Sequence, residues 1–386
     1  MFKSYRVGQV FGIPIRIDVT FFLVVPVFAW LIAGQLEAVI LVLNEGLGLD
    51  ISVTALTVGV LPLAAGLLAV FGLFVGVALH ELGHSLVAMR YGYEIDSITL
   101  WLLGGIAQPA EQPREWVHEF WIAITGPVVS VAIGVACYLA VLVVPSGLDL
   151  VIFLLAYLAV LNVALAVFNM LPAFPLDGGR VLRALLARSQ SYVRATRQAA
   201  AVGKGFAVLL GLAGLLVFNL FWILIAFFVY MAASAESKQM LLDAAFEGVT
   251  IDELMTPVED IETVPPDLPL STLLDRMLAD RHTGYPVFES GAFVGLVTLE
   301  DVQNAEADAS VVREVMTPVE DLETVAPSSA VVDAFRELGF NEVGRLPVVE
   351  DGRLVGMVTR SDLMTAVTIT MQRRRIDEPT LSGRPQ

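Results

Sequence analysis

Two histidines and a glutamate stand together in His80-Glu81-Leu82-Gly83-His84, inside an apolar run from about residue 64 to residue 90. Residues four apart on a helix lie about 40° apart around its axis, so both imidazole rings can reach one point. This spacing suits a zinc ion, and Glu81 would stand beside the ion without binding it. From there Glu81 could take a proton from an attacking water. The pattern therefore predicts metal-assisted hydrolysis.

The apolar run around this motif is long enough to span a bilayer. Each ionisable residue at bilayer depth is disfavoured by roughly 2.5–3.5 kcal/mol, so three polar groups within five positions need a compensating role. The alternative is a satisfied pair of core histidines. Hydrophobic residues make up 56% of the chain and charged residues 16%, and the mean hydropathy is +0.74. Because Cys137 is the only cysteine, a metal within one chain must use His, Asp and Glu.

The hydropathy pattern predicts a multi-pass α-helical membrane domain. We expect six spans, at about residues 19–34, 64–90, 117–144, 150–171, 200–217 and 218–235. Residues 35–63 contain no Lys or Arg and are expected to form an outside loop, whereas residues 172–204 are rich in arginine. By the positive-inside rule the N-terminus, this arginine-rich loop and the C-terminal half face the cytoplasm. At 1.5 Å per residue, the motif then lies roughly 12 Å from the cytoplasmic end of its helix.

A catalytic zinc site needs a third protein ligand. Asp177 is the best candidate, because it follows the fourth span at the same expected depth as the histidine pair. Pro172 and Pro175 interrupt the helix before it, and non-helical backbone at membrane depth is tolerated where it lines a cavity or is covered by protein. The alternative is that Asp177 caps a helix that begins near Gly178.

Residues 95–108 are too short to span a membrane and carry β-type residues around Gly104-Gly105. They predict a hairpin or a re-entrant pair of strands. His118 stands beside Trp116 and Trp121 at the start of the next span. We expect it to lie at the membrane interface.

The pairing of HELGH with Asn169-Met-Leu-Pro-Ala-Phe-Pro-Leu-Asp-Gly-Gly-Arg180 in an apolar setting resembles the site-2 protease family of intramembrane zinc metalloproteases. The resemblance covers residues 1 to about 240. It implies one zinc ion per chain, held by His80, His84 and Asp177. It also implies that Glu81 is the general base and that Asn169 assists near the oxyanion or the substrate.

The resemblance further implies hydrolysis of peptide bonds in or near transmembrane segments, as in regulated intramembrane proteolysis. A helix hides its amides, so the substrate must unwind, and we expect residues 95–108 to hold it by strand addition. The segment around Gly104-Gly105 and the Gly126-Pro127 turn are also similar to the family. Asn162 is a further candidate, for which a hydrogen bond between neighbouring spans is an equal explanation.

The C-terminal half repeats itself at a constant offset of 61 residues. Met255-Thr-Pro-Val-Glu-Asp recurs at Met316, and Gly295-Leu-Val-Thr-Leu-Glu-Asp recurs as Gly356-Met-Val-Thr-Arg-Ser-Asp. A constant offset means two copies of one unit, each read as strand, helix, strand, strand, helix. The copies resemble paired CBS (cystathionine-β-synthase) domains, an α/β module. In that family a Thr and an Asp bind the ribose and phosphate of adenine nucleotides, and the matching residues here are Thr298, Asp301, Thr359 and Asp362.

The alternative for this pair is a dimerisation module with an empty cleft, through which the chain would form a homodimer. The predicted organisation is a protease domain at 1–240, a linker at 241–250, CBS domains at 251–308 and 309–368, and a flexible tail at 369–386. A transporter or channel gated by CBS domains would also combine apolar spans with such repeats, but would not explain Glu81 and Asp177. A catalytically dead membrane scaffold is a second alternative.

The negative charge is concentrated in the C-terminal half. Residues 1–235 hold 11 basic and 12 acidic residues, whereas residues 236–386 hold 12 basic and 28 acidic ones. Such a half repels nucleic acid and anionic lipid, which argues against them as its partners, and argues mildly against a highly charged nucleotide such as ATP. The chain has only three lysines, Lys3, Lys204 and Lys238. This composition suggests a salt-adapted prokaryote.

Overall fold

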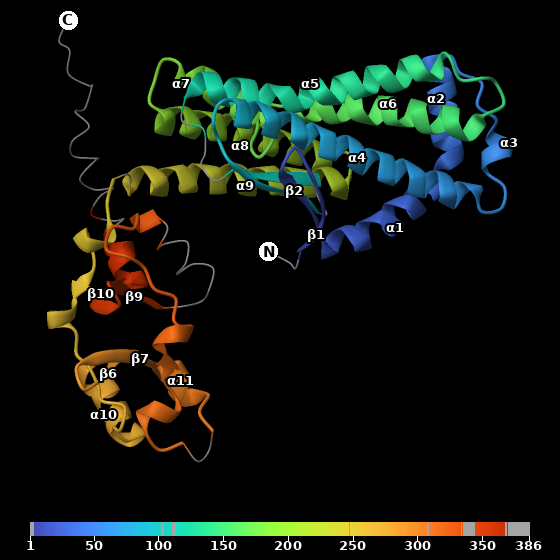
Figure 1. Ribbon diagram of the computed structural model, residues 1–386. Coiled ribbons are helices and arrows are strands. Elements are labelled where there is room, and N and C mark those ends of the chain that lie inside the picture. The colour runs from blue at the N-terminus through green and yellow to red at the C-terminus, as the bar shows by residue number, and fades with distance from the viewer. Residues whose placement is uncertain are drawn as a thin grey trace, which may run out of the picture. The chain divides into compact units, whose positions relative to one another are not determined.

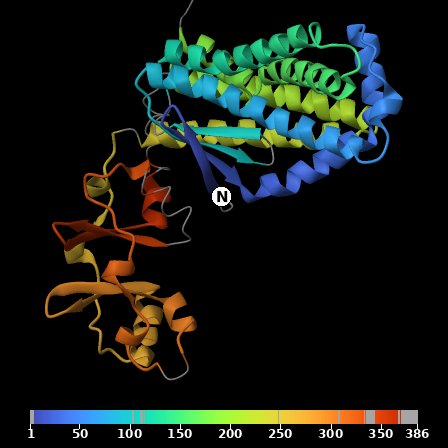
Figure 2. The ribbon, with the colours of Figure 1, turned by 45° about the vertical axis from the view of Figure 1, so that its right-hand side comes forward.

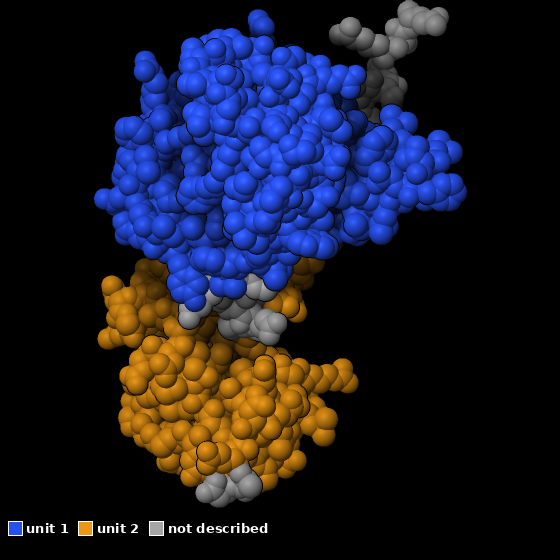
Figure 3. Space-filling view, turned by 90° about the vertical axis from the view of Figure 1, so that its right-hand side faces the viewer, with its two compact units in different colours: residues 1–238 blue, residues 239–386 orange. Residues whose placement is uncertain are grey.

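A computed structural model describes residues 4–101, 104–109, 113, 115–246, 248–306, 309–332, 334, 344–366 and 369. The expected flexible tail lies outside these residues, apart from residue 369. The chain forms two compact units, Met1–Lys238 and Gln239–Gln386, which Figure 3 shows in blue and orange.

The first unit is built mainly from long apolar helices (Figure 1). Five of the helices described are long and apolar enough to cross a membrane, and a sixth span results if the bent pair α1 and α2 is counted as one. This confirms the predicted multi-pass helical domain. The helices are α1 (Val19–Gly34), α2 (Leu36–Leu47), α3 (Val53–Leu56), α4 (Leu61–Arg90), α5 (Trp116–Val141), α6 (Asp149–Asn169), α7 (Asp177–Ala187), α8 (Tyr192–Leu216) and α9 (Leu220–Ala245).

The region expected to be an outside loop, residues 35–63, contains α2 and α3. Its apolar residues Leu36, Ile40 and Leu43 recur at helical spacing and are buried in a cluster with Phe153 of α6. These helices were not expected, because a lack of basic residues indicates which side of the membrane a segment faces and does not say whether it is helical. The helix α2 turns by 68° from α1.

A four-stranded sheet packs beside α4 (Figure 2). Its order is β1 (Ser4–Val10), β2 (Ile13–Asp18), β3 (Ile95–Trp101) and β4 (Gly104–Pro109). The pair β3 and β4 is antiparallel and confirms the strand pair expected at 95–108. The hairpin of β1 and β2 was not expected; β2 joins β3 in parallel, with Ile15 opposite Ile98.

The second unit consists of two repeats that exchange a strand with each other. Its elements include β5 (Thr256–Pro257), α10 (Leu270–Asp280), β6 (Gly284–Glu289), β7 (Ala292–Thr298), α11 (Leu299–Gln303), β8 (Thr317–Pro318), β9 (Arg345–Glu350) and β10 (Arg353–Thr359). The sheets have the orders β5-β10-β9 and β6-β7-β8. The first strand of each repeat therefore pairs with the other repeat, so neither sheet is made by one copy alone.

Candidate metal centre and active-site cavity

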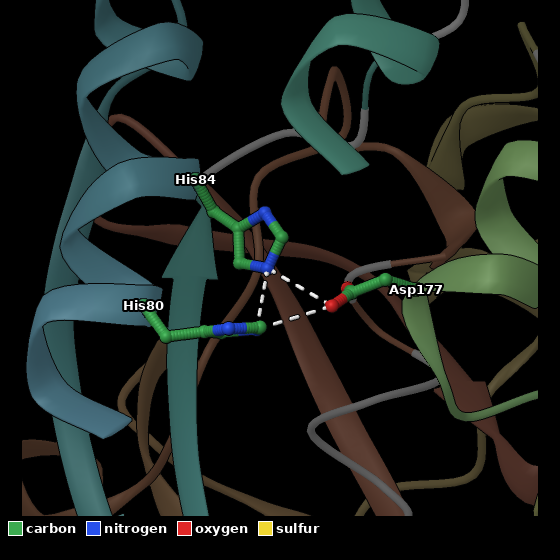
Figure 4. A group of neighbouring side chains, drawn as sticks. All are labelled: His80, His84 and Asp177. Atoms are coloured by element: carbon green, nitrogen blue, oxygen red, sulfur yellow. Dashed lines mark hydrogen bonds and ion pairs between the residues drawn. The ribbon is translucent and has the colours of Figure 1, made fainter. Parts of the chain in front are cut away.

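Three buried side chains from two helices converge on one point (Figure 4). His80 and His84 lie one turn apart on α4 and are 3% and 4% exposed, and Asp177 at the start of α7 is 8% exposed. Asp177 Oδ2 lies 3.1 Å from His80 Nε2 and 3.2 Å from His84 Nε2, and the two Nε2 atoms are 3.1 Å apart. The predicted candidate ligands are thus brought together from positions 97 residues apart.

This cluster fits a zinc ion. Ligand atoms about 2.0–2.1 Å from a tetrahedral zinc ion lie about 3.3 Å from one another, close to the three observed separations. Among the residues that the structure describes, His80, His84 and Asp177 are the group of His, Cys, Asp or Glu side chains placed to share a metal. Two imidazoles and a carboxylate are a common ligand set of catalytic zinc sites.

The other ring nitrogens of both histidines are engaged by α5. His84 Nδ1 lies 2.6 Å from the Ile122 carbonyl oxygen, and His80 Nδ1 lies 2.9 Å from Ser130 Oγ. A carbonyl oxygen can only accept, so His84 Nδ1 must carry the proton and its Nε2 keeps the lone pair that binds a metal. Ser130 is fully buried and can accept from His80 in the same way. Sequence reasoning missed Ser130, because a single serine in an apolar helix gives no signal of its partner.

Gly126 of α5 leaves the space in which the two Nε2 atoms meet. A Cβ atom at this position would lie 2.2 Å from His84 Nε2 and 2.7 Å from His80 Nε2. No side chain of that size is compatible with these distances. The turn expected at Gly126-Pro127 was wrong, because both residues lie inside α5, and Gly126 lies directly against the candidate metal site.

The alternative interpretation, in which Asp177 is the cap of α7, is wrong. The N-cap residue is Leu176, without a side-chain capping bond, and Asp177 is the first residue of the helix. Its Oδ2 atom faces the histidines, while Oδ1 lies 3.9 Å from the guanidinium of Arg180. A carboxylate is stabilised at a helix N-terminus by the helix dipole. The turn that carries Asp177 follows Pro172 and Pro175, where α6 has already ended.

Glu81 lies next to His80 on α4 and is close to strand β4. A Cβ atom on Gly105 would lie 2.5 Å from Glu81 Cγ and 3.2 Å from a methyl group of Val77. The backbone of β4 therefore passes directly over the Glu81 side chain. This contact explains the glycine at 105 and puts the candidate base beside an edge strand of the sheet.

A cavity of about 330 Å³ opens beside the cluster. Glu81 and His84 lie on its wall, together with Arg180, Arg183 and Glu236. The cavity holds enough space for several water molecules and part of a peptide. The candidate base and one candidate ligand thus face a space that a substrate could enter.

Charged side chains outside the metal cluster form a second buried group. Arg183 of α7 is 4% exposed and donates from Nε to Glu119 Oε1 at 2.7 Å, and its other end is paired with Glu236 of α9. Glu119 of α5 has no exposed surface and also accepts from the hydroxyl of Tyr192. The signal for this group in the sequence is Glu119, a glutamate inside a predicted span.

The remaining sequence candidates in this unit lie around the site. Asn169 ends α6, is partly buried and is not among the cavity-lining residues. Asn162 is 1% exposed and donates to the Leu158 carbonyl of its own helix, so the hydrogen bond described is not one between spans. His118 stacks on Tyr91, with 4.1 Å between the ring centroids.

The four candidate nucleotide residues form two matching pairs in the second unit. Thr298 Oγ1 donates to Asp301 Oδ2 at 2.7 Å, and Thr359 Oγ1 donates to Asp362 Oδ2 at 2.7 Å. The Thr298 and Asp301 pair forms a capping box at the start of α11. In the described residues, each carboxylate is therefore engaged by its own helix start.

Tyr285 begins the Tyr-Pro-Val segment of the first CBS sequence, which recurs as Leu346-Pro-Val in the second. Burial and the hydrogen bond that its hydroxyl donates to Asp280 raise the pKa of Tyr285 to about 12. The phenol therefore stays protonated at ordinary pH and remains a donor.

Both units of the chain match known protein families. Residues 68–150 and 147–212 match the model of Peptidase family M50, and residues 251–308 and 312–369 match that of the CBS domain. A zinc metalloprotease of Methanocaldococcus jannaschii is 35% identical over 370 residues, which cover 95% of this chain and 96% of that protein. Rip3 of Mycobacterium tuberculosis, also named as a zinc metalloprotease, is 33% identical over 326 residues, 80% of this chain and 81% of the relative.

A solved structure, the site-2 protease from Methanocaldococcus jannaschii, is 35% identical and covers 61% of this chain and 95% of its own, with a TM-score of 0.40. The similarity to the metalloprotease of the same organism extends over nearly the full length of both chains. It favours the protease prediction over the CBS-gated transporter. This chain belongs to Peptidase family M50, the site-2 protease family of zinc metalloproteases, and carries a pair of CBS domains in its C-terminal unit.

Proposed function

We propose that this zinc metalloprotease hydrolyses peptide bonds within or near the transmembrane segments of other membrane proteins, as a step of regulated intramembrane proteolysis. The observation that carries this proposal is the location of the candidate metal site. His80 and His84 are buried on α4, a helix of 30 residues that is long and apolar enough to cross a membrane. A metal site carried by a membrane-spanning helix can reach peptide bonds of other chains that lie in the same membrane.

In this proposal His80, His84 and Asp177 hold the zinc ion, and Glu81 is the general base. When bound, zinc supplies Lewis-acid polarisation of the scissile carbonyl and makes water more acidic. Glu81 faces the cavity, so it can take a proton from the attacking water and pass it to the leaving amine. Asn169 is proposed as a hydrogen-bond donor to the substrate near the oxyanion.

The unwound part of the substrate is proposed to pair with β4. This strand is at one edge of the sheet, so one side of its backbone has no strand neighbour among the residues described. Its residue Gly105 lies against Glu81. A peptide added to this edge would place its carbonyl groups beside the candidate base, and main-chain hydrogen bonds would compensate for the unwound helix.

The proposed location is the cell membrane, with the N-terminus and the CBS pair in the cytoplasm. The arginine-rich segment at 172–204 supports this orientation through the positive-inside rule. The strongly acidic and lysine-poor second unit supports a salt-adapted prokaryotic source.

Purified protein in lipid vesicles should cleave a single-span substrate that has a glycine-proline pair within its span. Chelation should abolish cleavage, and one equivalent of zinc per chain should restore it. A matched substrate with an uninterrupted leucine helix should be cleaved at least about tenfold more slowly, because unwinding it costs more. Cleavage that survives complete removal of zinc would contradict the protease proposal. Equal cleavage of both substrates would contradict the step in which an unwound segment pairs with β4.

The CBS pair is proposed to bind an adenine nucleotide and to modulate cleavage. Thr298, Asp301, Thr359 and Asp362 occupy the positions that match the nucleotide-binding residues of the family. We expect calorimetry on the full chain to detect binding of AMP, ADP, ATP or S-adenosylmethionine. Thr359→Ala should weaken that binding about tenfold, as expected for one lost hydrogen bond. No heat from any of the four would favour the dimerisation module, and equal cleavage with and without a bound nucleotide would exclude the modulation.

A further inference from the structure

The buried group around Arg183 has no role in the hydrolysis described so far. Its guanidinium lies between two carboxylates, Glu119 of α5 and Glu236 of α9. The same guanidinium lies over the rings of Phe174 and Tyr192, at 5.0 Å and 5.1 Å from their centroids. Arg183 therefore joins the start of α5, the helix of Asp177 and the last span at one point.

The two carboxylates are not equivalent. Glu119 is completely buried and accepts from both Arg183 and Tyr192, so removing it would leave a buried guanidinium short of a partner. The side chain of Glu236 is 30% exposed, and Arg183 would keep a full counter-charge in Glu119 if Glu236 moved away. The ion pair between Arg183 and Glu119 is thus expected to stay intact, whereas the ion pair between Arg183 and Glu236 can break.

Glu236 and Arg183 are also part of the wall of the active-site cavity. They line it together with Phe174, and with Glu81 and His84 on the catalytic side. The ion pair is therefore one of the contacts that hold α9 against the cavity, beside the apolar cluster that Ala233 of α9 forms with Phe174. If the ion pair opened, this wall of the cavity would lose its charged contact.

The helix that carries Glu236 leads directly into the second unit. Ala245, the last residue of α9, comes nine positions after Glu236, and the first unit ends at Lys238. The next residue, Phe246, is 2% exposed in the core of the second unit. The chain is helical from Glu236 to Ala245, so it forms a direct covalent path from Phe246 to Glu236.

We propose that the ion pair between Glu236 and Arg183 is a latch on the active-site cavity, and that the second unit controls it through α9. With the latch closed, α9 is held against the cavity wall. With the latch open, the cavity is more accessible to water and to substrate. This proposal deepens the proposed regulation of the same site, but its test does not depend on proteolysis.

The test measures how fast a charged, water-soluble thiol reagent reaches the cavity. Ala88 lines the cavity and is 4% exposed, so Ala88→Cys places a thiol inside it. Cys137 is the one native cysteine, and Cys137→Ser removes it. In this background Glu236→Gln should raise the modification rate about fivefold, which is the effect of losing one partly exposed ion pair.

Glu236→Asp should restore a rate close to that of the parent, because it keeps the charge. Asp243→Asn is the matched control: it removes a carboxylate seven residues further along the same helix, outside the cavity lining, and should leave the rate unchanged. Zinc content and thermal midpoint should be the same in the parent and in Glu236→Gln. Equal modification rates in these two proteins would overturn the latch.

A second substitution tests the link to the second unit. Phe246→Ala removes the side chain that anchors the end of α9 in the core of that unit. It should change the modification rate at least about twofold in the parent, but have no further effect in Glu236→Gln, because both act through one contact. An unchanged rate in the parent, or an additive effect in Glu236→Gln, would overturn the control by the second unit.

Discussion

Glu81→Gln is expected to lower the cleavage rate by about 10²- to 10⁴-fold and to leave one zinc ion per chain in place, because a positioned general base contributes rate accelerations of that size. Glutamine has nearly the same shape as glutamate but cannot accept the proton of the attacking water. The candidate ligands His80, His84 and Asp177 keep their contacts, since Glu81 is not one of the three converging groups. The measurement is zinc content and single-span cleavage in the same preparation.

A matched control is Glu94→Gln, which makes the same chemical change on an exposed residue beyond the end of α4. It should keep the activity of the parent. Full activity in Glu81→Gln would show that Glu81 is not the base. Loss of zinc together with activity would show that its role is to support the metal site.

Gly126→Ala is expected to lower zinc affinity by about 100-fold or more and to abolish cleavage. The added methyl group would lie 2.2 Å from His84 Nε2 and 2.7 Å from His80 Nε2, so one or both rings must leave their positions. Changes that merely remove an outer partner of a ligand weaken metal binding about 10- to 100-fold, and displacing the ligand itself should cost at least that much. Competition with a chelator of known affinity measures the effect without any substrate.

Gly205→Ala serves as the control for glycine replacement in a helix. A Cβ atom at Gly205 of α8 would meet no other atom within 4 Å, so this variant should bind zinc as the parent does. Unchanged zinc affinity in Gly126→Ala would mean that the rings can coordinate a metal elsewhere than at the point where they now meet.

The candidate metal ligands could be predicted because their signals are local. The four-residue spacing of His80 and His84 makes them neighbours on any helix, and Asp177 follows a span whose depth can be counted from its length. The repeats of the second unit were visible for the same reason, as a constant offset in the sequence. Predictions of this kind need helical geometry but no knowledge of tertiary packing.

The partners of these residues could not be predicted, because they depend on how distant segments pack. Ser130 is 50 residues from His80, and Arg183 is 64 residues from Glu119 and 53 from Glu236. The exchange of β5 and β8 between the repeats is likewise a tertiary property. The Thr-Pro segments to which these strands belong are identical in the two repeats, so the sequence does not say which sheet each one joins.

The groups that hydrogen-bond to Nδ1 of the two histidines differ in how easily a mutation can remove them. His80 relies on the side chain of Ser130, which a single substitution can remove, whereas His84 relies on a main-chain carbonyl at Ile122 that every amino acid supplies. A saturation screen for defective zinc binding should therefore recover changes at 130. At position 122 it should recover only those that displace the helix itself.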